Sequence, residues 1–314
     1  MIALPLVVAA AVSFSPLALR ELAAEGKERY DMWAKEKVRY LADRVRKDPH
    51  NAQLRVLLGN ALYEDGHHYE AESHLQKALE LQPGYAEAHC NLAVILHAES
   101  RLGEAERHYQ AALEVDTSLV EAKAGLGALW CRTKHHNEGI ALLEWVIGFD
   151  PNRINARYNL AVAYHKIGDY AMAIEHLGVV LEQNPTYPGG RRGLAQARFS
   201  RGLILLTAKK TEEALAQFDA AVKLVPDDAD IYYAQGIAHM RLDQLEPAER
   251  AFTTAVELEE DHVPALHNLG TVMEKAGRKT EAEYYFIQVQ ALTPHLHTIE
   301  AAREATYNEE YLMR

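Results

Sequence analysis

The sequence predicts an all-α fold, a right-handed solenoid of seven stacked helical hairpins with a capping helix at each end. Three rows of residues carry this prediction, because each recurs every 34 residues apart from one step of 41. The first row is small: Gly59, Ala93, Gly127, Ala161, Gly202, Gly236 and Gly270. Twelve residues later comes a second small row: Ala71, Ala105, Gly139, Ala173, Ala214, Ala248 and Ala282. Four residues further on comes a large apolar row: Leu75, Tyr109, Leu143, Leu177, Phe218, Phe252 and Phe286.

The spacing of these rows indicates two amphipathic helices per unit. The small residues let two helix backbones approach closely, and the large residue fills the gap beside them. A proline near the end of most units ends the second helix, because the residue before proline avoids helical angles. These prolines are Pro83, Pro151, Pro185, Pro226 and Pro294, with Thr117 and Glu260 as the exceptions. A single hairpin cannot bury its apolar face alone, so neighbouring hairpins must stack.

The three rows and the proline position resemble the tetratricopeptide repeat family. The resemblance covers residues 52–296 as seven units: 52–85, 86–119, 120–153, 154–187, 195–228, 229–262 and 263–296. It implies a superhelix whose concave face is lined by the first helix of each unit. It also implies a non-catalytic protein that holds another protein on this face.

Residues 1–19 form an uncharged apolar segment, and Arg20, Lys27 and Arg29 follow it. This length is close to the ~20 residues that span a bilayer as a helix. Lysine and arginine on the C-terminal side favour an anchor that leaves the repeats in the cytoplasm. Two alternatives stay open: a signal peptide of an exported protein, and a terminal helix that packs on the protein.

Two further segments flank the repeats. Residues 20–51 are predicted to be a linker and an N-terminal capping helix, with the helix over 30–47 and ending before Pro49. Residues 297–314 combine Ile299, Tyr311 and Leu312 with many charges, which favours a C-terminal capping helix.

Residues 188–194 are a seven-residue insertion between the fourth and fifth units. Seven residues are about two helical turns, so the first helix of the fifth unit can lengthen without changing its facing. Arg191 and Arg192 within it make this segment either a tolerated length variant or a ridge for a second docking contact. Arg201 stands where preceding units have leucine, so this joint is either open to water or satisfied by an acid.

Composition excludes several functions. A net charge of −12 argues against a nucleic-acid partner, which needs a basic stripe. There is no phosphate loop, nucleophile elbow, HExxH or CxxC motif, so we expect no catalytic residue, no small-molecule substrate and no cofactor. His97, Cys131 and His165 share one position in three successive units, but first helices ~10 Å apart cannot bring three ligands to one metal.

An apolar stripe identifies the candidate binding groove. The fifth, ninth and twelfth residues of a first helix lie on one face, because four and seven steps of 100° nearly return to the start. In units four to six these residues are apolar or aromatic with one histidine: Tyr158, Val162, His165, Phe199, Leu203, Leu206, Tyr233, Ile237 and Met240. The same positions in units one and seven are more polar. The prediction is a groove for an amphipathic helix or an extended apolar segment, unless the stripe is buried as core.

Two more rows flank the stripe. Arg132, Lys166, Arg241 and Lys275 recur one residue beyond it and either receive acidic groups at the rim or form a solvated edge. Asn91, Asn159 and Asn268 share another position and suit hydrogen bonds to a peptide backbone. Family members that clamp a carboxylate tail use Lys and Asn at defined groove positions; here Val56 replaces that Lys and only Asn60 matches, which disfavours this ligand.

The sequence therefore predicts a membrane-anchored adaptor or assembly factor that holds a protein partner. The alternatives are an exported repeat protein of a secretion, pilus or polysaccharide system, and a regulatory subunit of an enzyme.

Overall fold

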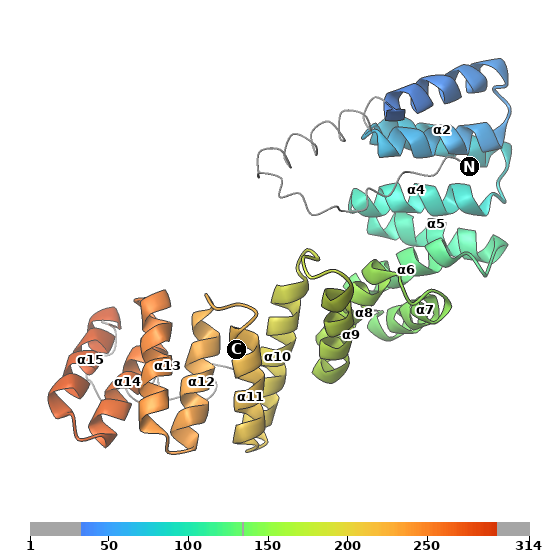
Figure 1. Cartoon of the computed structure of the whole chain (residues 1–314). Helices are drawn as coiled ribbons and strands as arrows, with labels where there is room; N and C mark the ends of the chain where they lie inside the picture. The colour runs from blue at the N-terminus through green and yellow to red at the C-terminus, as the bar shows by residue number, and fades with distance from the viewer. Residues whose placement is uncertain (1–32, 134, 294–314) are drawn as a thin grey trace, which may run out of the picture. The chain divides into compact units, whose positions relative to one another are not determined.

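The computed structural model describes residues 33–133 and 135–293, and all the secondary structure in these residues is helical (Figure 1). The predicted all-α repeat solenoid is confirmed: after a helix over 33–47, fourteen helices follow as seven hairpins. Their bounds are α2 (Ala52–Glu64), α3 (His68–Leu81), α4 (Ala86–Ala98), α5 (Leu102–Val115), α6 (Val120–Arg132), α7 (His136–Phe149), α8 (Ile154–Lys166), α9 (Tyr170–Gln183), α10 (Gly190–Thr207), α11 (Thr211–Val222), α12 (Ala229–Arg241), α13 (Leu245–Leu258), α14 (Val263–Lys275) and α15 (Lys279–Leu292).

The chain divides into two compact units, with unit 1 ending at Leu129 and unit 2 beginning at Trp130. Each is described by itself. Unit 1 holds the 33–47 helix, α2 to α5 and most of α6. Unit 2 holds the end of α6 and α7 to α15. The predicted anchor at 1–19, the predicted linker over 20–32 and the predicted C-terminal cap at 297–314 lie outside the described residues.

A left-handed residue closes the turn inside six of the seven hairpins, and the equivalent position 134 of the third lies outside the described residues. Gly66, Gly168 and Gly277 have φ of +84°, +85° and +79°, a conformation that costs glycine little. The equivalent positions in three other hairpins are Ser100, Lys209 and Asp243, with φ of 62°, 60° and 57°. The geometry is therefore a property of the repeat, and three non-glycine residues are held in it by the two helices.

Three of the second helices end in a side-chain turn. Asp116, Asp150 and Asn184 follow α5, α7 and α9, and their side-chain oxygens accept a backbone N–H from two residues later at 2.9, 3.1 and 3.1 Å. This turn competes with continuation of the helix.

The small and large rows interlock as predicted. A Cβ added to Gly236 would lie 2.7 Å from Cζ of Phe252 and nearer still to two other ring atoms. Gly202 stands in the same relation to Phe218, and Gly270 to Phe286. All three phenylalanines are buried. Each ring therefore occupies the space that a methyl group on the paired first helix would need.

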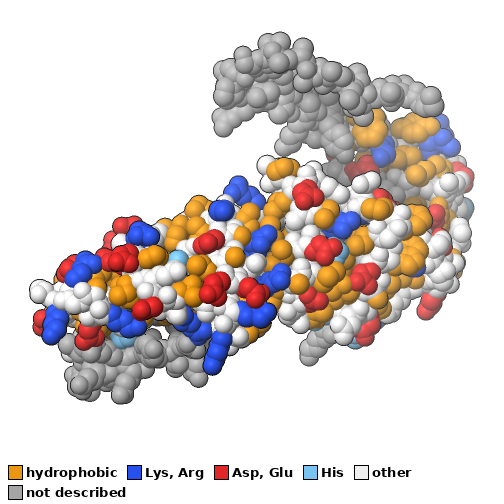
Figure 2. Space-filling model, turned by 60° about the horizontal axis from the view of Figure 1, so that its bottom comes forward, with side chains coloured by type: hydrophobic (Ala, Val, Ile, Leu, Met, Phe, Trp, Pro, Cys, Tyr) orange, Lys and Arg blue, Asp and Glu red, His pale blue; other side chains and the backbone are white. Residues whose placement is uncertain are grey.

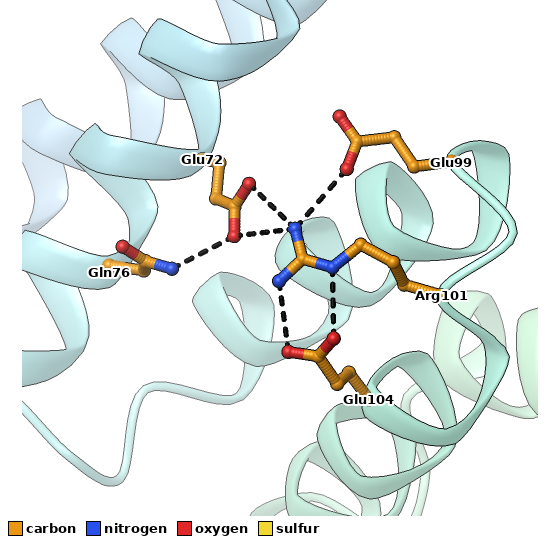
Figure 3. Close-up of polar contacts among 5 residues, drawn as sticks. All are labelled: Glu72, Gln76, Glu99, Arg101 and Glu104. Carbon is orange, nitrogen blue, oxygen red and sulfur yellow. Dashed lines mark hydrogen bonds and ion pairs between the residues drawn. The ribbon is translucent and has the colours of Figure 1, made fainter.

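An arginine just after the left-handed residue joins one hairpin to the one before it. Arg101 Nη1 lies 3.0 Å from both carboxylate oxygens of Glu72 in α3, while its Nε and Nη2 donate to Glu104 at 2.9 Å (Figure 3). Glu99 approaches the same guanidinium at 3.2 Å. Arg278 repeats the arrangement with Glu249 of the preceding hairpin and Glu281 of its own.

The 33–47 helix covers the first hairpin of unit 1. Ala34, Leu41 and Val45 are its buried residues, and Lys37 Nζ lies 2.7 Å from Glu64 of α2. At the insertion, α10 begins at Gly190 and has 18 residues where the other first helices have 13. Its extra residues extend the N-terminal end, and Gly189 starts the helix with φ of +76°.

Candidate functional site

The predicted binding stripe of unit 2 lies on the first helices α8, α10 and α12, and we call this predicted site the central groove. Its midline is the ninth position of each repeat, occupied by Val162, Leu203 and Ile237, and all three side chains are half-buried. Leu203 and Ile237 pack partly against the core cluster around Phe218, which fixes their inner edge. The rest of each side chain stays accessible, so Val162, Leu203 and Ile237 form an apolar row along the predicted groove.

The fifth and twelfth positions are more buried than the stripe predicted. Tyr233 is 2% exposed, its ring lies 5.7 Å from that of Phe252, and its hydroxyl accepts a hydrogen bond from Asn268 at 3.2 Å. Leu206 is 4% exposed and belongs to the core cluster. Both side chains belong to the core, Tyr233 in the cluster around Phe252 and Leu206 in the cluster around Phe218. Tyr233 and Leu206 are therefore core residues, and their prediction as groove residues is wrong.

The remaining stripe residues lie half-buried beside the midline. The Phe199 ring lies 6.0 Å from Phe218, and Met240 packs against the cluster around Phe252. His165 Nε2 lies 3.4 Å from Ser200 Oγ, and its imidazole contacts the Tyr170 ring at 5.1 Å. Burial lowers the pKa of His165 below its ordinary value, so the ring is neutral at pH 7.

Tyr158 marks the end of the groove at the insertion. Its ring lies 5.0 Å from Tyr187, and the Tyr187 hydroxyl donates to Asn155 Oδ1 at 2.8 Å. A Cβ on Gly189 would lie 2.8 Å from the Tyr158 hydroxyl. The left-handed glycine thus permits the close approach that holds the insertion against α8.

The predicted basic rim is partly engaged by backbone. Lys166 Nζ donates to the carbonyl of Cys131 at 3.2 Å, and Arg241 Nη1 donates to the carbonyl of Leu206. Both carbonyls lie near the C-terminus of the preceding first helix, where a cation also favours the helix dipole. Lys166 and Arg241 therefore have a structural role. Arg132 and Lys275 are exposed.

The predicted asparagine row contains one buried residue and two half-buried residues. Asn268 is buried and donates to Tyr233 and to the Pro264 carbonyl at 3.1 Å, so it is unavailable to a ligand. Asn91 and Asn159 are half-buried.

At the predicted ridge, Arg191 and Arg192 are exposed. Arg191 donates to the Leu224 carbonyl at 3.3 Å, and Arg192 lines a hollow of about 350 Å³ together with Asp227, Asp228, Asp230 and Glu259. Arg201 is half-buried, and no ion pair within the described part of the chain involves it. The joint is thus open to water, the first of the two predicted solutions.

A hollow of about 310 Å³ lies in unit 1, where the stripe positions are more polar. We call it the amide hollow. Its polar lining is Gln53, Asn60, Tyr85, Glu87, Asn91 and Glu121, and its apolar lining is Val56, Leu57, Cys90 and Leu119. In the first six repeats, the second residue of the first-helix segment is polar and exposed. These residues are Gln53, Glu87, Glu121, Asn155, Gln196 and Asp230, and the first three line the amide hollow. This row is not among positions five, nine and twelve, from which the groove was predicted.

The thiols and histidines offer no metal centre in the region described. Within residues 33–133 and 135–293, no group of three or more His, Cys, Asp or Glu side chains can hold a metal ion. Cys90 is buried, and burial together with Glu121 and Glu87 raises its pKa to about 12. Burial likewise raises the pKa of Cys131 to about 11, so both thiols stay protonated at neutral pH.

Charge on the surface is mixed. On the face drawn in Figure 2, lysine and arginine side chains are interspersed with aspartate and glutamate. Over the described residues, none of the helices has the length and apolar character needed to cross a bilayer.

Models of the tetratricopeptide repeat match residues 50–118, 154–187, 202–243 and 233–295, together more than half of the chain. Human Protein O-mannosyl-transferase TMTC2 is 34% identical over 86 residues, which are 26% of this chain and 10% of that protein. Tetratricopeptide repeat protein 8 of Caenorhabditis elegans is 26% identical over 149 residues, or 47% of this chain and 28% of that protein. The chain thus spans less than a third of these relatives.

Among solved structures, YrrB, a TPR protein with an unusual peptide-binding site, superposes with a TM-score of 0.48 at 26% identity, covering 62% of this chain and 96% of that one. Proteins built from this repeat are generally non-catalytic scaffolds that bind other proteins. With seven hairpins in one register and repeat models matched along most of them, the chain belongs to the tetratricopeptide repeat family.

Proposed function

We propose that this protein is an adaptor or assembly factor that holds a helix or an extended apolar segment of a partner protein in the central groove of unit 2. The observation that carries the proposal is the half-buried midline of Val162, Leu203 and Ile237. Leu203 and Ile237 pack partly against the core, and all three side chains stay partly accessible. Apolar groups in such a position favour a partner that removes them from water.

The proposal includes a membrane location. Residues 1–19 act as an uncleaved anchor and the repeats stay on the cytoplasmic side, supported by the uncharged length and the basic residues that follow it. The partner is then a component of a membrane complex that this protein helps to assemble or stabilise.

Site-specific photo-crosslinking tests the groove. A photoreactive amino acid replaces Leu203 or Ile237 in the full chain, expressed in the native cells. We expect both positions to yield an adduct with the same partner polypeptide. The matched control is Glu213 on α11, whose side chain is 58% exposed and lies outside the groove row. Equal adducts from position 213, or none from 203 and 237, would contradict the proposed site.

Fractionation tests the membrane location. Resistance to carbonate extraction together with an intact N-terminus is expected for an anchor. A mature chain that starts after about residue 19 would instead support the exported alternative.

A further inference from the structure

The 33–47 helix carries an excess of positive charge in an acidic chain. It holds six basic residues and two acidic ones, a net charge of +4, whereas the whole chain has a net charge of −12. The basic residues are Lys35, Lys37, Arg39, Arg44, Arg46 and Lys47, and the acidic ones are Glu36 and Asp43. Ala34, Leu41 and Val45 are buried, so the opposite side of the helix faces outward. The helix therefore concentrates cations on the outer surface of unit 1.

One row of this helix combines aromatic and cationic side chains. The row consists of Trp33, Lys37, Tyr40, Arg44 and Lys47, and its steps of three and four residues keep to one helix face. Trp33 is 54% exposed and Tyr40 is 60% exposed. Lys37 Nζ lies 5.1 Å from the centre of the Trp33 ring. The Arg44 guanidinium lies 5.8 Å from the centre of the Tyr40 ring, and its Nη1 donates to the Tyr40 hydroxyl at 2.9 Å. We call these five residues the aromatic–basic row.

Two structural effects explain part of this composition. Cations near the C-terminal end of a helix favour its dipole, which accounts for Arg46 and Lys47. Lys37 forms an ion pair with Glu64 of α2 at 2.7 Å. Neither effect accounts for the two large aromatic rings that the row leaves exposed. The row therefore fits a ligand that receives cations and ring surfaces together.

A bilayer surface that contains anionic lipid has both properties. Its negative potential attracts lysine and arginine side chains near the surface. Tryptophan and tyrosine concentrate at the level of the lipid headgroups, where the ring is partly removed from water and its polar tip stays wet. Nucleic acid also attracts cations, but the net charge of this chain opposes its binding.

The sequence before the helix limits its distance from a membrane. Residues 20–32 separate the uncharged apolar segment 1–19 from Trp33, and three of them are basic. A segment of that length reaches at most about 45 Å when fully extended. If residues 1–19 lie in a bilayer, the aromatic–basic row is therefore within reach of its surface.

We propose that the aromatic–basic row docks on a membrane surface that contains anionic phospholipid. This inference deepens the membrane location proposed above and rests on it. The anchor determines that the chain stays at the membrane, and the row determines which side of unit 1 faces the lipid.

Lipid photo-crosslinking in reconstituted vesicles tests the docking. A photoreactive amino acid replaces Glu36, an exposed residue of the same helix, in the full chain. The vesicles contain phosphatidylcholine alone or mixed with phosphatidylserine. We expect position 36 to give lipid adducts in the mixed vesicles and few in the neutral ones. The same amino acid at position 69 of α3, where Tyr69 is 83% exposed, should give few adducts in either.

Charge variants measure the contribution of the row. At the phosphatidylserine content that gives half-maximal adduct, Arg44→Gln with Lys47→Gln should lower the docking equilibrium constant about thirtyfold, because each cation near an anionic surface contributes about fivefold. The preference for mixed vesicles should also disappear in about 1 M NaCl, where the Debye length is about 3 Å. The matched control, Lys77→Gln with Arg107→Gln, removes the same charge from exposed positions on α3 and α5 and should leave the adduct unchanged. Circular dichroism checks that both double variants are folded.

Flotation with the same vesicles separates the docking from the anchor. Flotation with both kinds of vesicle, without a lipid adduct at position 36, would overturn the docking and leave the anchor supported. Flotation with mixed vesicles alone, together with the adduct, would refute the anchor and support the docking. Flotation with neither would overturn both. Equal adducts in the two kinds of vesicle, or an equal loss in the control variant, would overturn the docking, as would a protein adduct in place of lipid in native membranes.

Discussion

Gly236→Ala tests the interlock between first and second helices. The added Cβ would lie 2.7 Å from Cζ of Phe252 and closer to two other ring atoms, where carbon atoms in contact normally stand about 3.5–4.0 Å apart. Phe252 is fully buried against Tyr233 and Phe286, so its ring has no space to retreat by the ~1 Å required. Overpacking of this kind costs about 1–3 kcal/mol.

The substitution also removes a glycine from a helix interior, which stabilises by up to about 1 kcal/mol. The overpacking dominates, so we expect a net loss of about 1–2 kcal/mol in the free energy of unfolding. Urea denaturation followed by circular dichroism measures this loss. Gly178→Ala in α9 is the matched control, because nothing lies within 4 Å of its added Cβ, and it should stabilise the protein.

The double variant Gly236→Ala with Phe252→Leu completes a cycle. Leucine is smaller than phenylalanine, and the equivalent positions of the fourth unit already combine Ala161 with Leu177. The two substitutions should therefore be less destabilising together than the sum of each alone. If Gly236→Ala is as stabilising as Gly178→Ala, or if the effects simply add, the interlock is not the reason for glycine at this position.

Three further predictions follow from the described contacts. Burial lowers the pKa of His74, His108 and His176 below 6.5, so the free energy of unfolding has its full value above pH 6.5 and falls as the pH drops toward the folded-state pKa. The triple variant His74→Gln, His108→Gln, His176→Gln should lose less unfolding free energy between about pH 7.5 and 5.5. An unchanged slope against pH would refute the assignment. Arg101→Gln should lower the urea midpoint at low salt, and the difference should shrink in about 1 M NaCl; a salt-independent difference would mean that lost packing dominates. Lys209→Gly should raise stability by about 0.5–1 kcal/mol because it relieves a left-handed non-glycine residue, whereas Lys210→Gly beside it should not.

The repeat register was predictable because its cause is local. Gly236 and Phe252 stand 16 residues apart in one hairpin, and every unit has a small residue and a large apolar residue at these two positions. The sequence therefore records this contact directly. The left-handed turn is predictable from sequence where glycine occupies it, as at Gly168, but not at Ser100, Lys209 or Asp243, which are not residue types that mark this conformation.

The candidate site was less predictable, since the exposed face of a first helix depends on its neighbours. Helical periodicity places Tyr158, Val162 and His165 on one side of α8 but does not say how that side is rotated relative to the next helix. Packing placed Tyr233 and Leu206 in the core and left the second position of the first six repeats exposed, whereas Pro264 at that position of the seventh is buried.

The basic row shows the same limit. Its period of 34 identified Lys166 and Arg241 as equivalent residues, and only the structure revealed that both bind carbonyls at the end of the preceding helix. Each of these carbonyls lies 35 residues before the side chain that binds it, in the preceding repeat, so the sequence around Lys166 or Arg241 does not indicate the contact.

By itself, the sequence determined the family, the seven hairpins and the residues that interlock within each, because these contacts lie within one repeat and repeat with it. The tertiary structure decided which side chains reach the concave surface and which polar groups there stay unsatisfied. Those properties arise from how one hairpin rotates against the next, and that rotation is set by packing summed over many side chains.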